Sequence, residues 1–153
     1  MEKEAYNIYE KEADSETFRR WEVVGTSHLG DFDQRKYNPL LIRERGKGLP
    51  VFTVYTAFSR IPFHHTLNAA YEHLFNWINT GKAPPTAPRT EWTADVTIAR
   101  DEYGNALGGI RLPEHQVPTA ANTGRANPPR PGHTDASNIF FASLVGTFEL
   151  FNS

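Results

Sequence analysis

The chain has 153 residues, with 16 Lys and Arg against 18 Asp and Glu, so its formal net charge is −2. Hydrophobic residues make up 39% of the chain, enough for the core of a single domain or partial domain over residues 1–153. The 11 glycines and 11 prolines argue against a helix bundle and predict many turns and long irregular connections.

The composition also excludes several classes of site and partner. Without cysteine there is no disulfide, no zinc–thiolate site and no cysteine nucleophile. Lys and Arg form no cluster, so we expect no nucleic acid as a partner. No apolar run approaches the ~20 residues that a spanning helix needs, and the N-terminus lacks the apolar segment of a signal peptide. We therefore expect a soluble chain with no membrane span, and its cellular location stays open.

The first predicted element is a short strand at residues 18–25, which is rich in aromatic and β-branched residues and is closed by Gly25. Thr26, Ser27 and His28 follow as a loop. A histidine directly beyond the end of a strand stands where open α/β sheets carry their chemistry. From local sequence alone, a surface or packing histidine is an equally good interpretation of His28.

The clearest periodic pattern predicts an amphipathic helix at about residues 64–80. Its apolar side chains fall at helical spacing: Leu67, Ala70, Tyr71, Leu74, Trp77 and Ile78. Gly81 then stands where a left-handed residue ends a helix, and a pair of prolines follows. His64, His65 and His73 lie on or beside this helix, but no two of them have the i, i+4 spacing with which imidazoles share a metal. We expect no metal site and no cofactor.

The remaining sequence predicts a β-hairpin and then a Pro-rich tail. Residues 94–100 alternate polar and apolar, as a strand does. Residues 101–105 supply turn chemistry, so the hairpin is expected at about 94–112. Residues 121–153 are expected to be an irregular tail, with a short strand or helix within 139–150.

No segment has the spacing of a self-contained catalytic site. None of the six serines stands in the Gly-x-Ser-x-Gly turn that exposes a serine nucleophile. His133, Asp135 and Ser137 collect the residue types of a triad. Triads are assembled in space from separate loops, so closeness in sequence makes this cluster a weak candidate. Phosphate-binding, dinucleotide-binding and calcium-loop patterns are absent as well.

Three segments form a recognisable set in their order and spacing. They are FRRWEVVGTSH at residues 18–28, the helix and its proline exit at 67–85, and RDEYGNALGGIRLP at 100–113. Together they resemble the C-terminal part of a bacterial family of α/β-hydrolase-domain proteins, over most of residues 15–120. The resemblance implies an α/β (partial) fold, a C-terminal fragment of a hydrolase sheet, with His28 as the catalytic histidine after its last strand.

The resemblance also implies which parts are lacking. The triad of α/β-hydrolases follows the chain order Ser, acid, His, so the nucleophile and the acid belong upstream of His28. Only 27 residues precede it, too few for the other strands and their crossover helices. Glu10, Glu12 and Asp14 lie too close to the last strand to replace the acid. We therefore expect the C-terminal segment of an ester or acyl hydrolase, inactive alone. Its expected partner is an upstream hydrolase half or a second copy, and an ester substrate binds only in the complete enzyme.

Two other functions stay open, so whether the chain acts as an enzyme is not decided by its sequence. The first is a non-catalytic module that binds a protein or a carbohydrate through aromatic residues such as Trp21, Trp77 and Trp92. The second and weaker one is a metal-dependent enzyme that uses some of the six histidines, although none of them show ligand spacing.

Overall fold

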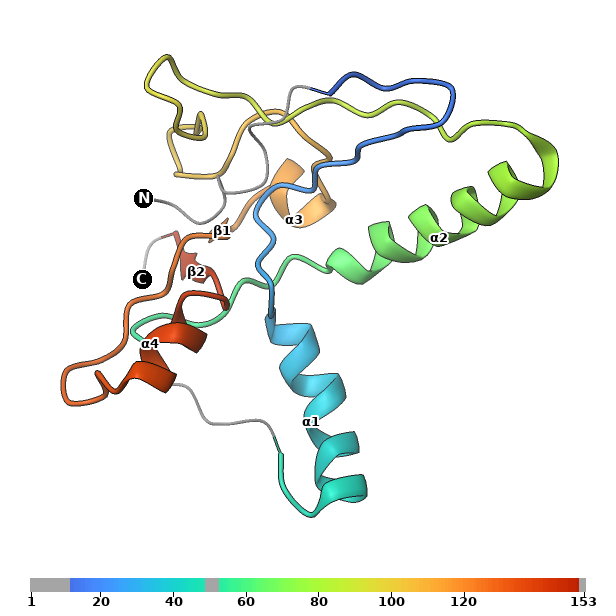
Figure 1. Cartoon of the computed structure of the whole chain (residues 1–153). Helices are drawn as coiled ribbons and strands as arrows, with labels where there is room; N and C mark the ends of the chain where they lie inside the picture. The colour runs from blue at the N-terminus through green and yellow to red at the C-terminus, as the bar shows by residue number, and fades with distance from the viewer. Residues whose placement is uncertain (1–11, 49–52, 152–153) are drawn as a thin grey trace.

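The structure is a computed structural model that describes residues 12–48 and 53–151. Its elements in chain order are α1 (Asp31–Arg45), α2 (Phe63–Thr80), α3 (Pro113–Gln116), β1 (Ala120–Thr123), α4 (Ala136–Ala142) and β2 (Thr147–Leu150). The two long helices, α1 and α2, extend away from the rest of the chain in different directions (Figure 1). Helices and a small antiparallel sheet together make a partial α/β fold.

The predicted amphipathic helix is confirmed as α2. It ends at Gly81, which has a φ of 72° and donates its N–H to the carbonyl of Trp77 at 2.8 Å. Thr66 is the only buried residue of the helix, whereas Leu74 and Ile78 are 48% and 74% exposed. The described parts of the chain therefore leave much of the apolar stripe of α2 uncovered.

Helix α1 was not predicted from the sequence. Its start is stabilised by Gly30, whose N–H donates to the carboxylate of Asp33 at 2.8 Å, and by an ion pair of 2.7 Å between Asp31 and Arg35. Acidic side chains in the first turn also favour the helix dipole. Pro39 stands inside the helix and none of its residues is buried, so neither propensity nor periodicity reveals it.

The segment predicted as the first strand is extended but pairs through one residue only. Val23 forms a parallel bridge with Ile110, in which Val24 donates its N–H to Ile110 at 3.2 Å and Ile110 donates to Glu22 at 2.7 Å. The N–H of Val23 faces the opposite edge and has no partner among the described residues. Gly25, with a φ of 74°, ends the segment as expected. Residues 18–25 are thus a strand segment without a regular ladder.

The predicted hairpin is present as a turn with short pairings. Three antiparallel bridges join its segments to each other and to the residues before them: Trp92 with Ile98, Arg100 with Ala106, and Thr90 with Gly108. In the turn, Asp101 accepts the N–H of Asn105 at 2.9 Å. The pairing therefore begins before residue 94, and each paired segment is too short to form a regular strand.

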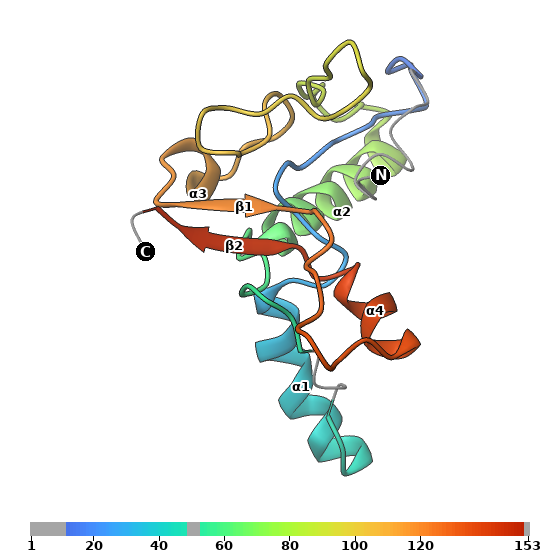
Figure 2. The same ribbon diagram turned by 90° about the vertical axis from the view of Figure 1, so that its left-hand side faces the viewer.

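The region expected to be an irregular tail contains regular elements. Strands β1 and β2 pair antiparallel, with Ala120 opposite Leu150 and Thr123 opposite Thr147 (Figure 2). Between them, α4 begins at Asp135, whose carboxylate accepts the N–H of Asn138 at 3.0 Å. A strand and most of a helix do lie near residues 139–150, but the pairing with β1 was missed. No described helix is long and apolar enough to cross a membrane.

Buried amides hold segments together where the apolar core is small. The described residues contain two apolar clusters, one of Val54, Ala142 and Val145 and the other of Val24, Ile98 and Ala106. Asn127 is fully buried and accepts the N–H of Thr56 at 3.2 Å while it donates to the carbonyl of Gly146 at 2.9 Å. Asn138 likewise accepts the N–H of Thr53 at 3.1 Å. These bonds fix the segment after residue 52 against the C-terminal part of the chain.

Candidate active site

His28 stands on the loop between the extended segment that ends at Gly25 and the start of α1. The loop is stiffened locally, because Thr26 donates its hydroxyl to the carbonyl of Val23 at 2.8 Å and Ser27 donates to Leu29 at 2.9 Å. The imidazole of His28 is exposed and makes no hydrogen bond or ion pair with the described residues. The backbone thus presents a free imidazole beyond the end of an extended segment.

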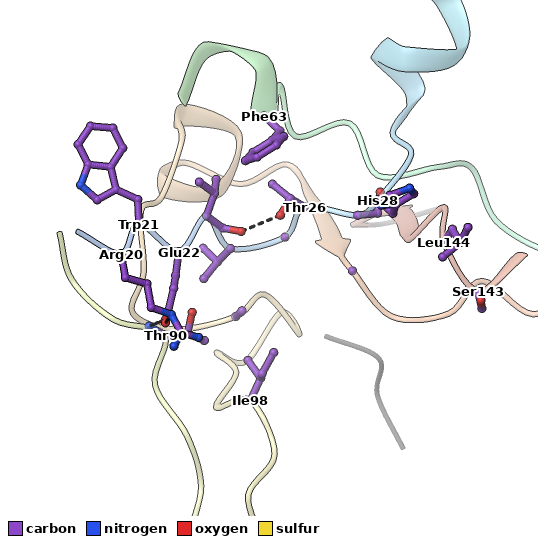
Figure 3. Close-up of a pocket in the computed structure, with 16 residues that line it drawn as sticks. Arg20, Trp21, Glu22, Thr26, His28, Phe63, Thr90, Ile98, Ser143 and Leu144 are labelled. Atoms are coloured by element: carbon purple, nitrogen blue, oxygen red, sulfur yellow. Dashed lines mark hydrogen bonds and ion pairs between the residues drawn. The ribbon is translucent and has the colours of Figure 1, made fainter. Parts of the chain in front are cut away.

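His28 also lines a cavity of about 780 Å³. Figure 3 shows Trp21 and His28 on opposite sides of Thr26, with Phe63 above the loop between them. Its lining combines apolar side chains such as Ile98 with the charged side chain of Glu22. A small organic molecule fits a cavity of this size and mixed lining.

Two acidic residues before the His28 loop are bound to arginines, and Asp31, just after the loop, pairs with Arg35 at 2.7 Å. Asp14 forms an ion pair with Arg89 at 2.7 Å, and Glu22 forms one with Arg20 at 2.8 Å. None of the described carboxylates contacts the imidazole of His28. A triad acid for His28 is therefore not present in the described part of the chain.

The weaker sequence candidates are not assembled into a site. Asp135 caps α4 through the N–H of Asn138, and Ser137 lies within that helix, so they do not form a triad with His133. Glu10 lies outside the described residues.

The histidines of α2 contact aromatic rings. The ring of His64 stacks on Phe32 at 3.7 Å between centroids and lies 4.0 Å from His65, while His73 meets Trp21 edge-on at 5.5 Å. Within residues 12–48 and 53–151, no three His, Asp or Glu side chains are grouped closely enough to hold a metal ion.

The three tryptophans are half-buried and contribute to the fold. The indole of Trp21 donates to the carbonyl of Pro85 at 2.9 Å, and the guanidinium of Arg19 lies 5.5 Å from the ring centre of Trp77. Trp92 packs against one of the two apolar clusters. All three rings stay partly accessible, so the binding module remains a hypothesis.

Sequence analysis missed His115, which lies in α3. Its side chain is fully buried, and neither ring nitrogen has a hydrogen-bond partner among the described residues. Burial, followed by the charges of Arg111 and Arg100, lowers the pKa of His115 to about 4 against the opposing effect of Asp101. The ring packs against Gly25, where a Cβ would approach Nδ1 to 2.8 Å. The only sequence signal for this burial is a histidine beside a helix-starting proline, which is weak.

The lowered pKa of His115 predicts that the free energy of unfolding decreases on acidification. Unfolded histidine titrates near pH 6.5, so between pH 6.5 and about 4 the unfolded chain binds more protons than the folded chain. The stabilisation is complete above pH 6.5 and is lost as the pH falls towards 4, by about 3 kcal/mol at most. Urea unfolding of a His115→Leu variant should show a smaller decrease over this range, whereas exposed His133→Gln should behave like the parent. An equally steep decrease in His115→Leu would contradict this assignment.

Comparison with known protein families identifies the family of the chain. A family model described as "Alpha/beta hydrolase domain" matches residues 2–153. Comparisons with curated proteins and with solved structures gave no significant match. The family match confirms the family suggested by the three sequence segments and extends through the C-terminal region. The chain belongs to the alpha/beta hydrolase domain family.

Proposed function

We propose that this chain supplies the catalytic histidine, His28, of an α/β-hydrolase that cleaves ester or acyl bonds. The nucleophile and the acid come from a part of the enzyme that these 153 residues do not contain. The observation that carries the proposal is the exposed, unpartnered imidazole that lines a cavity, on the loop just beyond the extended segment that ends at Gly25.

The chemistry assigned to His28 is general base and then general acid catalysis. The imidazole accepts the proton of the serine hydroxyl as the oxygen attacks the ester carbonyl. It then gives this proton to the leaving alkoxide, while a carboxylate on its other ring nitrogen fixes its tautomer. The printed sequence has no Gly-x-Ser-x-Gly turn, so the serine is assigned to the absent part.

Two unsatisfied surfaces support an additional part of the enzyme. The free N–H of Val23 lies on an open edge of the extended segment, where a neighbouring strand can form a hydrogen bond with it. On α2, Tyr71, Phe75 and Ile78 are 64%, 69% and 74% exposed. We propose that the nucleophile-bearing part covers these surfaces, and that a second copy of this chain associates through them in its absence.

The proposal is tested by hydrolysis of p-nitrophenyl butyrate. The purified chain is assayed alone and mixed with the nucleophile-bearing part, encoded upstream in the same or the adjacent reading frame. We expect no turnover by the chain alone and hydrolysis by the mixture. Inactivity of both, together with a cooperative melt of the chain alone, would contradict the proposal and favour a non-catalytic binding module.

A further inference from the structure

Ser59 connects the two ends of the loop that carries His28. Its side chain is 1% exposed, and its hydroxyl donates to the carbonyl of Gly25 at 2.6 Å. Its own carbonyl accepts the N–H of Asp31 at 2.9 Å, so the same residue is bonded before and after the loop. Its N–H in turn donates to Val145 at 3.3 Å, in one of the two apolar clusters. One buried serine thus joins residues 25 and 31 to the body of the chain.

The rest of the loop is held against the same body. Leu29 donates its N–H to the carbonyl of Leu144 at 3.0 Å. Gly30 lies so close to Ser59 that a Cβ on it would approach the serine carbonyl to 3.2 Å. His28 itself forms no side-chain bond with the described residues, so the position of its imidazole depends on these backbone attachments.

We propose that Ser59 is a positioning residue for His28, an inference that rests on the catalytic role proposed for that histidine. By fixing both ends of a loop of five residues, Ser59 limits the positions that the imidazole can adopt relative to an incoming serine. General base catalysis depends on a heavy-atom distance of about 3 Å, so small displacements of the loop reduce the rate strongly. The hydroxyl of Ser59 is buried and already donates to Gly25, so it is not the missing nucleophile.

The experiment is amide hydrogen exchange on the full chain with Ser59→Ala. Removing one buried hydrogen bond should speed exchange at Leu29 and Asp31 by about tenfold to a hundredfold. Exchange at Gly81 and Leu107, whose amides bond within other parts of the chain, should stay unchanged. An unchanged loop, or an equal rise at all four amides, would overturn the proposal.

Matched variants separate positioning from general destabilisation. Thr93→Val removes a hydroxyl that forms a hydrogen bond of 2.8 Å with Thr97, in a part of the chain outside the loop. This variant should leave the exchange rates of the Leu29 and Asp31 amides unchanged. Ser59→Cys keeps a side chain of similar shape with a weak donor. If Ser59→Ala does not fold, the same amide exchange rates are measured in Ser59→Cys instead. Loop-selective acceleration in either Ser59 variant supports the proposal, and its absence in a folded variant contradicts it.

Activity of the assembled hydrolase provides the second measurement. Ser59→Ala should lower kcat by about tenfold to a hundredfold and leave KM within about twofold, because the substrate still binds. A raised KM with an unchanged kcat would overturn the positioning role. If the unsubstituted mixture has no hydrolase activity, the proposed function fails, while hydrogen exchange still decides whether Ser59 fixes the loop.

Discussion

Replacing His28 by glutamine is expected to slow ester hydrolysis by the assembled hydrolase by at least about a thousandfold. Glutamine has a similar reach but cannot accept the proton of the attacking serine. The imidazole is exposed and makes no bond with the described residues, so the free energy of unfolding should change by less than about 0.5 kcal/mol. The measurements are p-nitrophenyl butyrate turnover by the mixture and urea unfolding of the chain.

His133→Gln is the matched control for this variant. His133 is also exposed, but it lies far along the chain in the loop before α4, away from the cavity that His28 lines. It should leave both the rate and the stability unchanged. If His28→Gln retained more than a tenth of the parent rate, His28 would not be the base.

The second large effect concerns Gly25, the residue that ends the extended segment before His28. Gly25→Ala should lower the free energy of unfolding by about 2 to 4 kcal/mol. Part of this arises from the φ of 74°, which costs an L-residue about 1 kcal/mol. The larger part arises from overlap, because the new Cβ would lie 2.8 Å from Nδ1 of His115 and 3.0 Å from the carbonyl of Asn122.

Gly81→Ala separates these two contributions. Gly81 has a φ of 72°, nearly the same as Gly25, but among the described residues no atom outside its chain neighbours and its own helix backbone lies within 4 Å of the position of its Cβ. Its replacement should therefore cost only about 1 kcal/mol in urea unfolding. Equal costs at the two positions would show that His115 does not pack tightly against Gly25.

The elements that were predicted from the sequence have local signals. The apolar spacing of α2 and the glycine at its end identify the helix without knowledge of any neighbour. Strand β1 lacks such a signal, because its sequence is Ala-Ala-Asn-Thr and its partner lies more than 20 residues later. A continuous strand was expected at residues 18–25. Among the described residues, this segment pairs through a single bridge, between Val23 and Ile110.

The candidate site divides in the same way. His28 was singled out because a histidine shortly after a predicted strand and its closing glycine is visible in the sequence, within a segment that resembles the family. Ser59 and His115 both contact Gly25. They stand 34 and 90 positions after it in the sequence. Neither stands in a catalytic motif, so contacts formed only in the folded chain were needed to find them.

The most direct test of the central claim is labelling of the serine nucleophile by a fluorophosphonate probe. The nucleophile-bearing part is incubated with the probe alone, with this chain, and with its His28→Gln variant. If this chain supplies the base, labelling should be fast only with the unsubstituted chain, because a serine reacts with the probe when an adjacent imidazole accepts its proton. Equal labelling in all three incubations would contradict the claim that His28 completes the active site.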